Sequence, residues 1–546
     1  MSHRSGSTRR ALLQGAGALS VIGASFTIQA CKAPGTKDVG EDDTGLGDTG
    51  VKDSEVEDTG GDDTADTGVP DVPVPRDQLS VLYISSDEHN PKALGFEGHP
   101  DASTPNLDRL AAEGMVLNRV YTSTPVCAPT RQSLLTGLWP QEHGQLTNAY
   151  VFHELNWTLA EHFTSQGFAT ACFGKLHTQN DEETYSFGFQ TFISTASGAR
   201  WDELYAAYVE GLDQPVADPE HEPIFAEIPF SGFDGHPLAD PRRDDDYIML
   251  QEAIAWLRAH KDERFFLYVS FRAPHYPWRL PDDYYYRFDP DLMTLPENVE
   301  GDLDDCRIGE HWVEEMGWDG MTEEQTRLCL ALYMGAVSWV DTLVGELLAV
   351  LEELGLTKST AVVYTSDHGD MLGEKGLWLK SCFFEGAARK PLIVRAPGHI
   401  PAGTRSDALL SELDLWPSLA GLIGAHEGLE ELSGQDHSAV LLGEQETGRD
   451  VVFSMFGIKT SDPYPWLMMA RDDRYKLVRY RTWTWDETAY ELYDLTLDPT
   501  EIDNIHDDPN LADRKATLSA AMDACLAGLR ESAFPPVMSE GGEDEE

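Results

Sequence analysis

The stretch that decides the fold begins Ser80-Val81-Leu82-Tyr83-Ile84 and continues Ser85-Ser86-Asp87-Glu88-His89-Asn90. Its first half is a short, mostly apolar run of the kind that forms a buried strand in a parallel sheet. Its second half is a polar cluster placed where that strand ends. Ligand sites in open α/β sheets lie at this carboxyl edge, so the stretch predicts a buried strand with a functional site beside it.

The same pattern recurs twice further along the chain. Residues 265–270 lead into Pro274-His275, and residues 361–364 lead into Ser366-Asp367-His368-Gly369-Asp370. Helical patterns lie between these runs, at Pro105–Glu113 with Thr104 as a candidate N-cap, and at 325–354. The alternation predicts an α/β fold in which a large, mostly parallel sheet is sandwiched by helices.

Changes in composition along the chain predict a division into parts. Residues 78–445 are expected to form the domain that carries these motifs. Residues 446–535 are expected to form a smaller C-terminal α+β subdomain, with short strands at 466–470, 475–479 and 491–493 and a helix at 510–529. Residues 32–77 are predicted to be a disordered acidic linker and residues 536–546 an acidic tail, because neither has enough apolar residues for a core.

Residues 1–31 are predicted to be an export signal. Arg9 and Arg10 precede a long apolar stretch, as in twin-arginine signals, and the stretch ends Ile28-Gln29-Ala30-Cys31, which resembles a bacterial lipobox. We therefore expect an exported bacterial protein in the periplasm or at the cell surface, with membrane contact only through a lipid on Cys31. A plain cleaved signal and an uncleaved anchor are the alternatives.

The charge balance excludes one class of partner. The chain has 40 basic and 95 acidic residues, a formal net charge of −55. Nucleic-acid binding needs basic patches, so no nucleic-acid partner is expected. The seven cysteines are an odd number, so at least one is unpaired or modified.

The sharpest motif is Cys127-Ala128-Pro129-Thr130-Arg131, followed by Leu134-Leu135-Thr136-Gly137. It resembles the signature of the sulfatase family, Cys-x-Pro-x-Arg with a Leu-Thr-Gly continuation. Thr130 departs from the commoner Ser or Ala. The resemblance implies that Cys127 is converted to formylglycine by a formylglycine-generating enzyme. One hydroxyl of the hydrated aldehyde would attack sulfur, and deprotonation of the other would expel sulfate.

The resemblance also implies a divalent metal held by hard ligands. The implied ligands are Asp87, Glu88, Asp367 and His368, with the group derived from Cys127. Glu88 stands where the family has Asp, Asn or Gln. The family favours Ca²⁺, and Mg²⁺ is the alternative. The plain alternative for each strand-end carboxylate is a turn or helix N-cap.

Further motifs supply the cations and proton carriers that a sulfate ester needs. Gly174-Lys175-Leu176-His177 and Pro274-His275-Tyr276-Pro277 resemble the family's Gly-Lys-x-His and Pro-His-x-Pro. By this resemblance Lys175 binds a sulfate oxygen, His177 helps to deprotonate the hydrate, and His275 contacts sulfate or the leaving oxygen. Lys380 would hold sulfate and assist the leaving group, and Arg131 would hold the formylglycine.

The resemblance covers about residues 80–510 and implies membership of the alkaline phosphatase superfamily, with 78–445 as the sulfatase catalytic domain. Asp370-Met371-Leu372-Gly373-Glu374-Lys375-Gly376-Leu377-Trp378 and Phe383-Phe384-Glu385-Gly386 resemble choline sulfatases. The C-terminal region resembles them less, so the implied substrate is a sulfated small molecule or carbohydrate. Two other functions stay open: a phosphonate monoester hydrolase or phosphodiesterase of the superfamily, and a non-catalytic binder of sulfated polymers.

Overall fold

The computed structural model describes residues 73–148, 157–177, 186–195, 199–212, 235–299, 303, 306–429, 431–457, 466–481 and 489–530. The predicted export signal, nearly all of the predicted linker and the predicted acidic tail lie outside the described residues. The domain boundaries therefore stay predictions.

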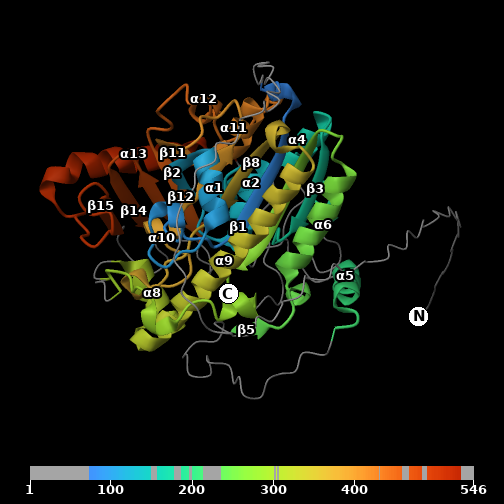
Figure 1. The fold of residues 1–546 in the computed structure, drawn as a ribbon. Helices are drawn as coiled ribbons and strands as arrows, with labels where there is room; N and C mark the ends of the chain where they lie inside the picture. Colours follow the sequence, from blue (N-terminus) through green and yellow to red (C-terminus); the bar gives the residue numbers. More distant parts are fainter. Residues whose placement is uncertain are drawn as a thin grey trace, which may run out of the picture. The chain divides into compact units, whose positions relative to one another are not determined.

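The core of the described chain is a nine-stranded sheet (Figure 1). Its order is β11-β2-β10-β8-β1-β6-β3-β4, and β9 pairs with β2. Neighbours are parallel except where β10 lies against β8 and β2, and where β9 pairs with β2. The predicted large, mostly parallel sheet is thus confirmed. Its strands are β1 (Ser80–Asp87), β2 (Met115–Tyr121), β3 (Ala169–Gly174), β4 (Thr191–Ile193), β6 (Phe265–Pro274), β8 (Thr360–Ser366), β9 (Arg389–Lys390), β10 (Leu392–Arg395) and β11 (Thr404–Ser411).

The three strands recognised in the sequence lie side by side at the centre of this sheet. Val81 of β1 is in register with Phe266 of β6 on one side and with Ala361 of β8 on the other. All eight residues of β1 are buried. Since the three strands are parallel, their carboxyl ends meet at one edge, as their sequences predicted.

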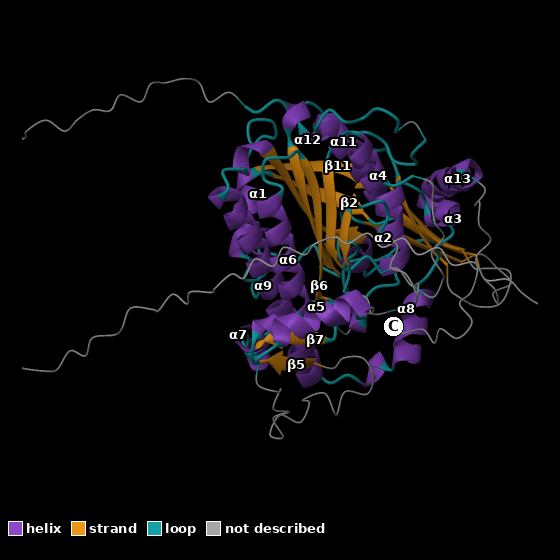
Figure 2. Cartoon of the chain, turned by 90° about the vertical axis from the view of Figure 1, so that its right-hand side faces the viewer, coloured by secondary structure: helices purple, strands orange, loops and turns teal. Residues whose placement is uncertain are grey.

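Helices cover both faces of the sheet (Figure 2). Leu82 and Ile84 of β1 pack into one hydrophobic cluster, and Val81 and Tyr83 into another, because successive side chains of a strand point to opposite faces. The first cluster includes residues of α1 (Pro105–Glu113), α6 (Asp245–Ala259) and α9 (Glu323–Glu353). The second includes residues of α2 (Cys127–Thr136), α4 (Leu159–Ser165), α11 (Leu415–Leu422) and α12 (Ser438–Leu441). The sandwich predicted from the alternating pattern is therefore present.

Helix α9 is the central helix of the first layer. Thr322 and Gln325 form a capping box at its start. It is long and apolar enough by composition to cross a membrane, but 83% of that apolar window is buried inside the protein. Such burial is typical of the core helix of a globular domain, which can be as apolar as a membrane-spanning helix.

The start of α1 differs from the sequence prediction. Thr104 occupies the N-cap position, but its side chain makes no capping bond. Its hydroxyl donates instead to Asp108 Oδ1 at 2.9 Å. Asp341 of α9 takes over the capping role, since its carboxylate accepts the backbone N–H groups of Asn106 (3.0 Å) and Leu107 (2.8 Å). A carboxylate satisfies helix-start amides as a cap does, so a contact between helices replaces the local one.

A second, antiparallel sheet follows in the chain, in the order β12-β13-β14-β15. Its strands are β12 (Val452–Gly457), β13 (Trp466–Arg471), β14 (Tyr475–Arg481) and β15 (Ala489–Asp494), and α13 (Ala512–Gly528) packs on it. Three of these strands and the helix match the predicted segments. The remaining described elements of four residues or more are α3 (Pro140–His143), α5 (Ala199–Val209), β5 (Gly235–Leu238), β7 (Trp278–Pro281), α7 (Asp282–Tyr285), α8 (Arg307–Met316) and α10 (Glu385–Ala388).

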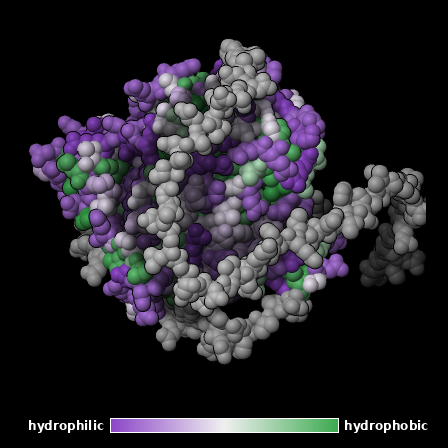
Figure 3. Space-filling view, viewed as in Figure 1, coloured by the Kyte–Doolittle hydropathy of each residue, from purple (hydrophilic) through white to green (hydrophobic). Residues whose placement is uncertain are grey.

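The described surface is mostly hydrophilic on the face drawn in Figure 3, where hydrophobic residues form small, separate patches. The exposed large hydrophobic residues of the described chain are also scattered along it: Trp157, Tyr286, Leu292, Leu497 and Ile502. Single exposed residues of this kind are normal on a folded domain and indicate no docking face by themselves.

A buried ion-pair network joins the second sheet to the main domain. Lys476 of β14 is fully buried, and its ammonium lies 2.7 Å from Glu385 Oε1 and 2.8 Å from Glu501 Oε1. It also donates to the carbonyl oxygen of Phe383 at 2.8 Å. Burial acts to raise the pKa of Glu385, but Lys476 and Arg389 outweigh it and hold that pKa at about 2. The pair is therefore charged at neutral pH.

We expect Lys476→Met to lower the free energy of unfolding by about 3–5 kcal/mol, because it leaves the buried Glu501 carboxylate without its cation and leaves Glu385 only the more distant Arg389. Urea unfolding followed by tryptophan fluorescence measures this change. Lys261→Met is the matched control, since Lys261 forms an exposed pair with Asp262 that is worth at most about 1 kcal/mol. Equal losses in the two variants would contradict the role given to Lys476.

Candidate active site

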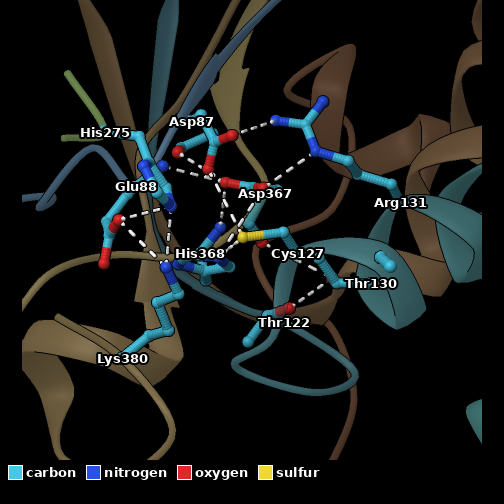
Figure 4. A network of polar contacts seen from close by, with 12 residues as sticks. Asp87, Glu88, Thr122, Cys127, Thr130, Arg131, His275, Asp367, His368 and Lys380 are labelled. Carbon is cyan, nitrogen blue, oxygen red and sulfur yellow. Dashed lines mark hydrogen bonds and ion pairs between the residues drawn. The ribbon is translucent and has the colours of Figure 1, made fainter. Parts of the chain in front are cut away.

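The predicted site residues come together at the carboxyl edge of the main sheet (Figure 4). Asp87 ends β1, Asp367 directly follows β8, and His275 directly follows β6. Cys127 is the first residue of α2, which starts beside these strand ends. Order in the sheet therefore brings four segments that are far apart in sequence to one point.

Cys127 lies fully buried at the start of α2. Its Sγ is 3.1 Å from His368 Nε2 and 3.6 Å from Asp87 Oδ1. Burial, and then the charge of Asp87, raises the pKa of the Cys127 thiol to about 12. Without a bound cation the unmodified thiol therefore stays protonated at neutral pH and is a poor nucleophile, since the thiolate is the reactive form.

Four side chains present a set of donors that fits a metal ion. One donor atom from each of Asp87, Cys127, Asp367 and His368 lies within 4.8 Å of all the others, and all four residues are buried. Burial acts to raise the pKa of Asp87, but Lys175 and Arg131 outweigh it and hold that pKa well below its usual range. A buried, ionised carboxylate beside further oxygen donors is what a hard divalent cation prefers.

The ring of His368 is oriented for the same purpose. Its Nδ1 lies 2.9 Å from the carbonyl oxygen of Gly369, so Nδ1–H is the donor of that hydrogen bond. The lone pair of Nε2 then faces Cys127 and the Asp367 carboxylate, whose Oδ2 is 3.6 Å away. Metal-binding histidines are commonly held in this way, with the other ring nitrogen donating to a carbonyl.

Glu88 is placed somewhat apart from these four. Its backbone has a positive φ of 66°, and its N–H donates to Asp367 Oδ1 at 2.9 Å. Its Oε2 lies 3.2 Å from Lys380 Nζ and 3.3 Å from His275 Nε2. Burial raises the pKa of Glu88 to about 8, even though Lys380 opposes this. Glu88 belongs to a second donor group, with Asp87 and His275, so its role as a metal ligand stays a prediction.

The Arg131 side chain connects several of the site segments by hydrogen bonds and ion pairs. Its Nε donates to Asp367 Oδ2 at 3.0 Å, and its Nη2 lies 3.3 Å from Asp87 Oδ2. Its Nη1 donates to the carbonyl oxygen of Lys175 at 2.8 Å and to Ser270 Oγ at 2.7 Å. The guanidinium therefore contacts the ends of β1 and β8, residue 270 of β6 and the segment that follows β3.

The four residues predicted to bind sulfate or to carry protons also lie near the donor group around Cys127. Lys175 pairs with Asp87 Oδ2, and Lys380 Nζ lies 2.8 Å from His275 Nε2. Burial, and then the nearby Lys380, holds the pKa of His275 well below its usual range. Burial, and then Lys175, does the same for His177. His177 Nδ1 is buried without a hydrogen-bond partner among the described residues.

A buried network under α2 has no counterpart in the sequence prediction. The Thr130 hydroxyl lies 2.6 Å from both carboxylate oxygens of Glu412, and Lys390 Nζ donates to Glu412 Oε2 at 2.9 Å. Thr122 Oγ1 lies 2.5 Å from Thr130 Oγ1. Thr130 is thus held by a buried ion pair, and nothing in the local sequence around Glu412 signals it.

Asp370 is a second residue that the sequence argument left without a role. Its Oδ1 accepts the N–H groups of Leu372 (2.7 Å) and Leu379 (3.2 Å). These bonds close the loop that ends at Lys380. The sequence motif Asp-His-Gly-Asp could have indicated this role, since its last residue is Asp370 at the start of that loop.

Comparison with known proteins identifies the family of this chain. A family model described as Sulfatase matches residues 80–425, and one described as N-sulphoglucosamine sulphohydrolase, C-terminal, matches residues 373–527. A choline-sulfatase of Rhizobium meliloti (strain 1021) is 29% identical over 483 residues, which are 84% of this chain and 89% of the relative.

Two solved structures share the fold. A phosphonate monoester hydrolase of Agrobacterium radiobacter superposes with a TM-score of 0.70 at 24% identity, covering 82% of this chain and 95% of that one. A protein solved in complex with its substrate D-glucosamine-2-N,6-O-disulfate superposes with a TM-score of 0.64 at 22% identity, covering 82% and 97%. The first family model spans more than half of the chain and covers every predicted site residue. The chain therefore belongs to the sulfatase family of sulfuric ester hydrolases.

Proposed function

We infer that this protein hydrolyses a sulfate ester to an alcohol and inorganic sulfate, with a formylglycine made from Cys127 as its nucleophile and a divalent metal beside it. The observation that carries this inference is the position of Cys127 between the donor group of Asp87, Asp367 and His368 and the ammonium groups of Lys175 and Lys380. A nucleophile placed between a metal site and cations suits an anionic ester.

Formylglycine would supply, as its hydrate, an attacking hydroxyl and a second hydroxyl whose deprotonation expels sulfate. The buried environment of Cys127 supports the need for this modification, because a protonated thiol attacks sulfur poorly. The maturation partner is then a formylglycine-generating enzyme. His177, whose pKa burial and the nearby Lys175 hold low enough to keep its ring neutral, is proposed to take the proton from the hydrate.

The metal would be held by Asp87, Asp367 and His368 with the group derived from Cys127, and Glu88 is the further proposed ligand. A bound divalent cation would polarise the nucleophile and a sulfate oxygen. Oxygen donors dominate this set, and they favour Ca²⁺ or Mg²⁺ over softer metals. Arg131 keeps two of these carboxylates in place through its ion pairs with Asp87 and Asp367.

Lys380 and His275 are proposed to serve the leaving group. The low pKa of His275 keeps its ring neutral, and Lys380 Nζ lies 2.8 Å from His275 Nε2 and 3.2 Å from Glu88 Oε2. The Lys380 ammonium therefore donates toward His275 Nε2, and His275 Nδ1–H donates to the carbonyl oxygen of Tyr276. A proton is thus available where the ester oxygen departs.

The family relatives support a sulfated small molecule or carbohydrate as substrate. The choline ester is suggested by the Rhizobium relative, and sulfated sugars by the glucosamine disulfate complex. The signal-like residues 1–31 support export and anchoring through a lipid on Cys31. The site's cations would serve a phosphonate ester as well, so that reaction is the second candidate.

Hydrolysis of 4-nitrophenyl sulfate and of an aryl phosphonate monoester separates the two candidates. We expect the purified full chain, matured with a formylglycine-generating enzyme, to have the larger kcat/KM for the sulfate, as the sulfatase family predicts. Absorbance of released 4-nitrophenol measures both rates. A clear preference for the phosphonate would refute the sulfatase assignment, and no hydrolysis of either would favour the sulfate-polymer binder.

Replacing the nucleophile tests the chemistry directly. Cys127→Ala is expected to lower kcat for 4-nitrophenyl sulfate by at least about 10³-fold, because loss of a nucleophile removes the covalent route. Peptide mass measurement of the wild-type chain should show formylglycine at position 127. Cys525→Ala is the matched control, since Cys525 lies on α13 of the C-terminal part, where its charged neighbours are Arg449 and Glu142. Near-wild-type activity in Cys127→Ala would contradict the proposal.

Removing the metal tests the donor group. Protein freed of metal with a chelator is expected to lose activity and to recover it with Ca²⁺ or Mg²⁺. The added ion should also raise the unfolding temperature, because a ligand bound only by the folded state stabilises it. Asp367→Asn should abolish this rise, whereas Asp407→Asn, which changes an exposed carboxylate, should preserve it. A verified metal-free sample with full activity would overturn the metal site.

A further inference from the structure

A cavity lies directly beside the leaving-group side of the proposed site. Its volume is about 260 Å³, and His275 forms part of its wall. His275 also contacts Lys380 and Glu88 in the polar cluster around Cys127. The cavity is therefore placed to receive the group attached to the ester oxygen, if the function proposed above is correct.

One wall of the cavity carries cations. Arg243, Arg272 and Arg279 all line it. Within the described part of the chain, neither Arg272 nor Arg279 makes a side-chain hydrogen bond or an ion pair. Arginine stays protonated at any physiological pH, and its planar fork matches carboxylate and sulfate oxygens.

Three carboxylates also line the cavity, but two of them are already used by the fold. Asp246 accepts the backbone N–H groups of Arg272 (2.7 Å) and Ala273 (2.8 Å). Asp244 accepts the N–H of Tyr247 (2.9 Å) and of the Trp339 ring (3.0 Å). Burial raises the pKa of both, that of Asp246 to about 7. Asp245 is the carboxylate whose charge acts on both Arg272 and Arg279, so two arginines face one carboxylate there.

Aromatic side chains also line the cavity. Trp201 and Tyr205 of α5 are half-buried, and their ring centroids lie 5.7 Å apart at an interplanar angle of 45°. Such rings offer a flat apolar surface with polar edges, against which the C–H face of a sugar ring can pack. The volume lies just under the range of about 300–1,000 Å³ that is usual for small-molecule sites, so it suits one ring.

We propose that this cavity is the subsite for the leaving alcohol, that it takes one sugar ring against Trp201, and that Arg272 and Arg279 select a ring with a second anionic group. That group is a carboxylate or a further sulfate, which share the same oxygen geometry. A quaternary ammonium such as choline would meet guanidinium groups here, so a choline ester is disfavoured.

Competition against 4-nitrophenyl sulfate tests the subsite. The probes are N-acetylglucosamine 6-sulfate with one anionic group, glucosamine 2-N,6-O-disulfate and glucuronate 2-sulfate with two, and choline sulfate. We expect at least one dianionic probe to bind about tenfold more tightly than the monoanionic sugar, or better, since a charge-assisted hydrogen bond strengthens binding by roughly that factor or more. The two dianions distinguish a sulfate-type from a carboxylate partner. Choline sulfate should inhibit least.

Variants connect the preference to its residues. R272Q and R279Q should bring the ratio of the inhibition constants of the monoanionic sugar and the tighter-binding dianionic sugar toward one. R279Q is less apt to disturb folding, because Arg279 is exposed. W201A should weaken both sugars and preserve their ratio. R242Q is the matched control: Arg242 is an exposed neighbour that pairs with Asp240 and does not line the cavity. Because each result is a ratio, any change in turnover cancels.

Three results would overturn the proposal: equal inhibition by the monoanionic and dianionic sugars, an unchanged ratio in both arginine variants, or choline sulfate as the strongest inhibitor. Failure of the proposed function looks different, since the folded wild-type chain would then not hydrolyse 4-nitrophenyl sulfate at all. In that case calorimetric titration of the same probes measures the same ratio, so the subsite is tested independently of turnover.

Discussion

Arg131 is fully buried, and its guanidinium bonds to the side chains of Asp87, Asp367 and Ser270 and to the backbone of Lys175. These partners lie on β1, β6, after β8 and after β3. Removing a guanidinium and two carboxylates from water costs several kcal/mol for each ion, and only close pairing offsets this cost. The strand ends therefore cannot separate without exposing unpaired charge, and this constraint fixes the distances between the donor atoms around Cys127.

Other buried charged groups set the position of Lys380. Asp370 closes the loop that ends at Lys380, and Lys375 in that loop donates to the carbonyl oxygen of Glu501 at 2.5 Å. Glu501 in turn pairs with Lys476 of the second sheet. The C-terminal sheet thus contributes to the active site indirectly, because it supports the loop from which Lys380 reaches His275.

The proposed site would recognise the sulfate group and the alcohol of the substrate by different physical interactions. In the proposed binding mode the sulfate group would lie where ionised carboxylates, histidines and ammonium groups converge in a buried space, so electrostatics at low dielectric would dominate there. The alcohol would lie in the cavity beside His275, where aromatic packing and the half-buried Arg272 and exposed Arg279 would act.

The sequence by itself determined the central strands, the main helices and the polar residues that the structure brings together at the sheet edge. Apolar runs such as 80–84 and 361–364 are local signals, and polar residues directly after parallel strands must meet at one edge. Local patterns could not supply the contacts between distant residues. Asp341 caps α1 from 235 positions away, and Glu412 holds Thr130 from 282 positions away. Such pairs, like the cavity between α5 and the segment after β6, depend on the order of strands and the packing of helices, which only the tertiary structure decides.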